Sequence, residues 1–98
     1  MQRRTLTLAT AEKLINHNRA EEYGAADISF HRIAMLWSAY TGHTINKADV
    51  ANMMVLLKVA RAKASPQKQD SYDDMAGYAA LAAELAIGEL TDEEKNSL

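Results

Sequence analysis

The clearest pattern of apolar positions lies in residues 50–62, where all but three positions carry apolar side chains. A segment that is apolar around its whole circumference is typical of a helix buried on most sides. The segment is too short, and too charged at its end, to span a bilayer. We therefore predict a central buried helix over residues 47–64.

Apolar residues recur at helical spacing in three further segments. A loop at 65–70 contains the chain's single proline and separates the last two helices. No segment pairs as strands, so the predicted fold is an all-α, four-helix bundle-like domain. The predicted helices are 11–23, 28–41, 47–64 and 71–87. They form a helical domain at 10–88, which lies between an N-terminal arm at 1–9 and an acidic C-terminal tail at 89–98.

The composition limits the class of protein. With 98 residues the chain forms one small domain, which buries little surface alone, so we predict a homo-oligomer. Eleven basic and thirteen acidic residues argue against a general nucleic-acid binder. There is no cysteine, and no signal peptide or membrane span is visible, so we expect a cytoplasmic setting and no membrane partner.

One acidic side chain is predicted to point into the bundle. Asp74 begins a stripe that continues at helical spacing through Leu81 and Leu85. A buried carboxylate is costly unless it is paired. Lys58 and Arg61 are three residues apart on the central helix and share a face. We therefore predict that Asp74 contacts one of these two cations.

Two neighbours of Asp74 have simpler interpretations. Asp73 is interpreted as an acid of the first helical turn that faces solvent. Gly77 lies in the middle of a helix, where glycine costs about 1 kcal/mol relative to alanine. We expect another helix or a ligand to approach closely at Gly77.

The polar residues predicted near the core form one candidate site. Acids and bases on facing helices suit a carboxylate cluster that holds Mg²⁺, with Lys or Arg on a phosphate. They equally suit a structural salt-bridge network that fixes the register of the helices. The candidate residues are Asn18, Arg19, Glu22, Lys58, Arg61, Asp70 and Asp74, with Tyr23 and Tyr78 nearby.

Three stretches resemble a small phage and prophage domain family without an assigned function. The stretches are RAEEYGAADISFHRIAMLWSAYTG at 19–42, INKADVANMMVLLKVARAKA at 45–64 and KQDSYDDMAGYAALAAELA at 68–86. The family pattern has Asp directly after YG and Asn before Phe, where this chain has Ala25 and Ser29. The resemblance implies a phage protein that acts in the cytoplasm of the host cell.

That family is in turn similar to the MazG-like all-α nucleoside triphosphate pyrophosphohydrolases, which are oligomeric and Mg²⁺-dependent. The similarity implies that Glu22, Asp70 and Asp74 hold Mg²⁺ and carry catalysis. It also implies that Lys58 and Arg61 bind phosphate. The acids are fewer than in those enzymes.

Three hypotheses therefore stay open at this stage. The first is an enzyme that hydrolyses a nucleoside triphosphate or a related nucleotide, with Tyr23, Trp37 or Tyr78 stacked on the base. The second is a protein that binds and sequesters a nucleotide without turnover, including a cyclic nucleotide of bacterial immune signalling. The third is a structural interaction module in which Asp74 only sets the helix register.

Overall fold

The computed structural model describes residues 1–18 and 25–97, and these residues form helices and no strand. The all-α prediction is therefore confirmed. The elements are α1 (Arg3–Lys13), the π-helix η1 (Leu14–Asn18), α3 (Ala26–Thr41), α4 (Lys47–Ala64), α5 (Gln69–Ile87) and α6 (Asp92–Asn96). No helix in this part of the chain is both long enough and apolar enough to cross a membrane.

The first helix begins earlier than the sequence suggests. Residues 3–9 are predicted to form an arm, but they form the first turns of α1. The alternation of polar and apolar residues in this stretch hides its helical phase, because only Ala11 of α1 becomes buried. The start of α1 therefore belongs to the folded domain.

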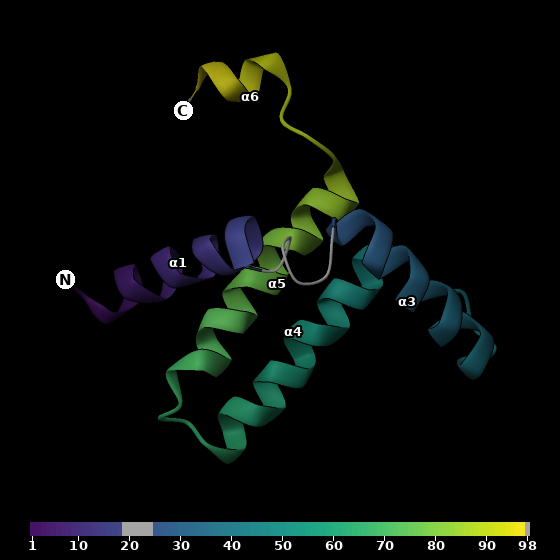
Figure 1. Cartoon of the computed structure of the whole chain (residues 1–98), viewed down its shortest axis with the longest axis horizontal. Coiled ribbons are helices and arrows are strands. Elements are labelled where there is room, and N and C mark those ends of the chain that lie inside the picture. Colours follow the sequence, from purple (N-terminus) through teal and green to yellow (C-terminus); the bar gives the residue numbers. More distant parts are fainter. Residues whose placement is uncertain (19–24, 98) are drawn as a thin grey trace.

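The hairpin of α4 and α5 is the centre of the fold. These two helices lie side by side and are joined by a short loop, while α1 crosses α5 and α3 packs against α4 (Figure 1). The short α6 stands apart from the four long helices (Figure 1). The buried core lies where α3, α4 and α5 meet, and consists of Phe30, Ala34, Val50, Ala51, Leu81 and Ala82.

The central helix is buried on one side only. Val50 and Ala51 are fully buried against α3 and α5. On the opposite side Leu56 is exposed, and Leu57 at the edge of the buried side is exposed as well. The prediction of burial on most sides is therefore wrong for the single chain, since an apolar surface shows which side chains avoid water but not what covers them.

Local signals at the helix ends act as their residue types suggest. The side chain of Asn46 accepts a hydrogen bond from the Asp49 backbone N–H, and Asp49 accepts one from the Asn46 backbone in return. This reciprocal capping box fixes the start of α4. Gly42 ends α3 in a left-handed conformation at φ 75°, which suits glycine because it has no Cβ.

The close approach expected at Gly77 is confirmed. A Cβ atom added to Gly77 would lie 3.2 Å from the Ile15 Cγ2 atom and 4.0 Å from the Ala11 carbonyl oxygen. The absence of a side chain at this position therefore lets α1 and η1 cross α5 at short range.

Candidate functional site

The ion pair predicted at the hairpin is present. The Lys58 Nζ atom lies 2.9 Å from the Asp74 Oδ2 atom, and their side chains are 19% and 30% exposed. Asp74 therefore turns toward α4 as predicted. Arg61 lies about one turn further along α4, exposed, and among the described residues it makes no ion pair.

We expect the Asp74→Asn substitution to destabilise the fold. The change leaves the Lys58 ammonium partly buried without its counter-charge. The free energy of unfolding should fall by about 1–2 kcal/mol, which lies between the values for losing an exposed and a buried ion pair. For a domain of this size the melting temperature should fall by about 5–15 °C. Thermal unfolding followed by circular dichroism measures the loss.

Asp70→Asn is the matched control for this substitution, because Asp70 is an exposed aspartate on the same helix. An equal loss of stability in both variants would contradict the role given to the Lys58–Asp74 pair.

The other predicted acids do not gather around Asp74. Asp70 is exposed in the first turn of α5. Asp73 is only 6% exposed, so the prediction that it faces solvent is wrong. It turns inward because α1 covers this side of α5, where the Gln69 Nε2 atom donates to its Oδ1 atom at 2.7 Å. The part of the chain that the structure describes brings no three acidic or histidine side chains into a metal-binding group.

The predicted aromatic residues have different positions. Tyr78 packs against the core, with its ring stacked on that of Phe30 at a centroid distance of 6.3 Å. Trp37 also packs against the core. Arg19, Glu22 and Tyr23 lie outside the described residues, and Asn18 is described only as the last residue of η1, so their predicted roles stay predictions.

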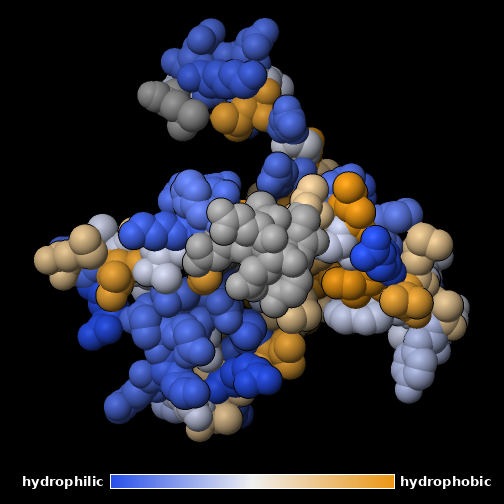
Figure 2. Space-filling view, viewed as in Figure 1, coloured by the Kyte–Doolittle hydropathy of each residue, from blue (hydrophilic) through white to orange (hydrophobic). Residues whose placement is uncertain are grey.

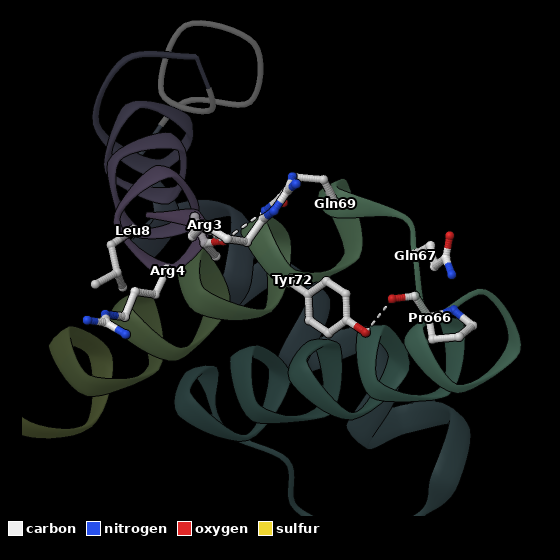
Figure 3. A pocket seen from close by; sticks show the side chains of 8 residues that line it. Arg3, Arg4, Leu8, Pro66, Gln67, Gln69 and Tyr72 are labelled. Atoms are coloured by element: carbon white, nitrogen blue, oxygen red, sulfur yellow. Dashed lines mark hydrogen bonds between the residues drawn. The ribbon is translucent and has the colours of Figure 1, made fainter. Parts of the chain in front are cut away.

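A groove lies between the start of α1 and the loop that joins α4 to α5 (Figure 3). It is open to solvent and has a volume of about 880 Å³. Two arginines, three neutral hydrogen-bonding side chains and an aromatic ring gather there, without an acidic residue. The lining residues are Arg3, Arg4, Thr7, Leu8, Pro66, Gln67, Gln69 and Tyr72.

One glutamine organises the groove. Gln69 donates from its Nε2 atom to Thr7 Oγ1 at 2.8 Å and to Asp73 Oδ1 at 2.7 Å. Its Oε1 atom accepts a hydrogen bond from Arg3 at 3.2 Å. Because a carboxylate only accepts hydrogen bonds, Asp73 fixes the orientation of the amide and so directs Oε1 toward Arg3. The Arg3 guanidinium keeps most of its donors for a ligand.

This groove was not predicted from the sequence. Arg3 and Arg4 fall in the predicted N-terminal arm, and the partners of Arg3 and Thr7 on α5 are more than sixty positions away. One signal was available: two cations in the first turn of a helix, without an acid, oppose the helix dipole. Such a pair of cations indicates an anion-binding site only when the stretch is known to be helical.

The architecture defines the class of protein: a small all-α domain built on a helical hairpin, with a basic groove at one end. The chain belongs to the family described as Domain of unknown function (DUF6378), which matches residues 6–86. This match, together with the two phage relatives given below, confirms the resemblance to a small phage domain family, while the similarity to MazG-like enzymes stays a prediction.

Two phage proteins are similar to this chain. The "Gene 55 protein" of Mycobacterium phage L5 is 45% identical over 83 residues, which are 84% of this chain and 53% of that protein. The "Gene 55 protein" of Mycobacterium phage D29 is 44% identical over 72 residues, which are 74% of this chain and 48% of that protein. The chain thus spans about half the length of the curated relatives it matches. No solved structure matches it significantly.

Proposed function

We propose that this phage protein binds a phosphorylated nucleotide in the groove between α1 and the α4–α5 loop. The observation that carries the proposal is that Arg3, Arg4 and the Tyr72 ring line one groove without an acidic lining residue. Guanidinium groups suit phosphate, and an aromatic ring suits a nucleobase. The volume lies in the range of small-molecule sites, about 300–1,000 Å³.

Helix electrostatics favour an anion at this position. Arg3 and Arg4 lie in the first turn of α1, at the positive end of the helix dipole, where cations are disfavoured. The N-cap residues of α1 and α5, Gln2 and Lys68, make no side-chain capping bond. A bound phosphate would offset both the arginine charges and the positive helix ends.

The Tyr72 side chain is also held in position to stack on a ligand. The Tyr72 hydroxyl donates to the Pro66 carbonyl oxygen at 2.8 Å, which ties the side chain to the loop. Its ring lies between Arg4 and Pro66 in the close-up view (Figure 3). A base stacked there would leave its phosphate within the reach of the arginines, while Gln67 offers amide groups to the base edge.

Hydrolysis with Mg²⁺ is the finer possibility that the family resemblance suggests. The described residues do not fit a Mg²⁺ site well, because Lys58 already engages Asp74 and no three acids come together. We therefore propose binding as the function and derive no step through a metal. One of the three acids that the resemblance assigns to Mg²⁺ does adjoin the groove in sequence. This acid is Asp70, which lies in the first turn of α5 directly after the groove residue Gln69.

Isothermal titration with a nucleotide panel tests the proposal. The panel contains nucleoside mono-, di- and triphosphates, cyclic dinucleotides, an unphosphorylated nucleoside and inorganic phosphate. We expect one phosphorylated nucleotide to bind more tightly than its nucleoside or phosphate alone, in the presence of EDTA as well. The ligand should be recovered unchanged. Product that forms only with Mg²⁺ would instead indicate hydrolysis.

Two tyrosine variants locate the binding. Tyr72→Ala should weaken the binding about 10-fold or more, since stacking on one base contributes about 1–3 kcal/mol. Tyr40→Ala removes a tyrosine that is 93% exposed on α3 and should leave affinity unchanged. The proposal fails if no member of the panel binds, or if both variants bind as the wild type does.

A further inference from the structure

Large apolar side chains remain exposed on α3 and α4. We define the outer apolar surface as Met35, Leu36, Tyr40, Met53, Leu56 and Leu57. Leu36 and Leu56 are 65% and 66% exposed, although both belong to long helices of the domain. Figure 2 shows apolar side chains gathered over α3 at the right of the view. Monomeric proteins seldom leave large contiguous apolar patches in water.

The single chain has a larger accessible surface and a larger radius of gyration than a compact monomer of its size. Its accessible surface is 7305 Å², against about 5,500 Å² expected for a compact monomer of this mass. Its radius of gyration is 14.6 Å, against about 12.6 Å expected. Part of the excess belongs to α6, which stands apart (Figure 1). The excess is comparable to the roughly 1,000–2,500 Å² that each subunit buries in an obligate homodimer.

We propose that the outer apolar surface is the interface with a second copy of this chain. Residues 33–41 of α3 and 50–57 of α4 contain no charged side chain. Two identical uncharged surfaces can therefore meet around a two-fold axis without like-charge repulsion. A partner selected by complementary charge would find nothing to pair with there.

The spacing on α4 suits a helix–helix contact. Met53, Leu56, Leu57 and Ala60 recur at intervals of three and four residues, so they lie along one side of the helix. Ala60 is small enough to let a second helix approach closely. The adjacent α3 packs directly on α4 and carries three further exposed apolar side chains, those of Met35, Leu36 and Tyr40. This proposal does not depend on nucleotide binding.

Molar mass in solution tests the interface. Sedimentation equilibrium of the full chain should give at least twice the chain mass, and Leu36→Glu and Leu56→Glu should each shift it toward the monomer. Leu90→Glu is the matched control, because Leu90 is an exposed leucine outside the surface, and it should keep the wild-type mass. Circular dichroism checks that the variants stay helical. The milder Leu36→Gln and Leu56→Gln replace any acidic variant that unfolds.

A monomeric wild-type chain over a wide concentration range would overturn the proposal. So would an oligomer whose mass is unchanged in folded Leu36 and Leu56 variants, since the interface would then lie elsewhere. Retained nucleotide binding in a monomeric variant would show that the two proposals stand or fall separately.

Discussion

The double variant Arg3→Gln, Arg4→Gln should bind the nucleotide selected by the wild-type chain about 100-fold more weakly. Two charge-assisted hydrogen bonds to phosphate are lost, each worth about 1.5–3 kcal/mol, and even the lower values add to about 3 kcal/mol. About 1.4 kcal/mol corresponds to a tenfold change in Kd. Isothermal titration at constant salt measures the difference, because charge-driven binding varies with ionic strength.

The stability of the same variant separates a binding role from a structural one. Removing two cations from the positive end of α1 relieves unfavourable electrostatics and offsets the lost Arg3–Gln69 hydrogen bond. The melting temperature should therefore stay close to the wild-type value while the affinity falls. A large loss of stability without a loss of affinity would contradict the proposed site.

Arg32→Gln with Lys63→Gln is the matched control for this double variant. Arg32 and Lys63 are exposed cations outside the groove, so the net charge changes by the same amount. We expect wild-type affinity for this control. An equal weakening in both double variants would show that the ligand responds to overall charge rather than to the groove.

The Gly77→Leu substitution should have the largest effect on stability. A Cβ atom added at this position would already lie 3.2 Å from the Ile15 Cγ2 atom, so a leucine side chain must push η1 and α1 away from α5. Overpacking of this kind costs about 2–3 kcal/mol. The melting temperature should fall by about 10–20 °C. Thermal and chemical unfolding followed by circular dichroism measure the loss.

The same substitution should also impair the groove. Arg3, Arg4 and Thr7 are carried by α1, while Gln69 and Tyr72 are carried by α5, so a displaced α1 separates the two sides. Nucleotide binding is expected to fall together with stability. Ala79→Leu, at an exposed position on the same helix, is the control and should change neither quantity much. A fully stable Gly77→Leu protein would contradict the crossing of α1 and α5 at this point.

Features that depend on near neighbours in the sequence were predictable. The Asn46–Asp49 capping box and the end of α3 at Gly42 follow from contacts within one helical turn. The Lys58–Asp74 pair follows from helical phase, because the short loop after α4 forces the two faces together. These features need no knowledge of how distant segments meet.

Features that depend on distant contacts were missed or misread. The inward position of Asp73 follows from α1 lying over α5, which the stripe of apolar residues does not indicate. The extent of burial of α4 was misjudged for a similar reason, since apolar composition does not say whether the cover comes from the same chain.

The sequence by itself determined the helical class, the hairpin of α4 and α5 and the inward turn of Asp74, because local propensity and periodicity decide these features. Only the tertiary structure decided that two arginines and an aromatic ring line one groove. Arg3 meets Gln69 across 66 positions, and such a contact depends on the crossing of two helices rather than on the residues beside either one. The candidate ligand site and the exposed side of α4 are therefore properties of packing.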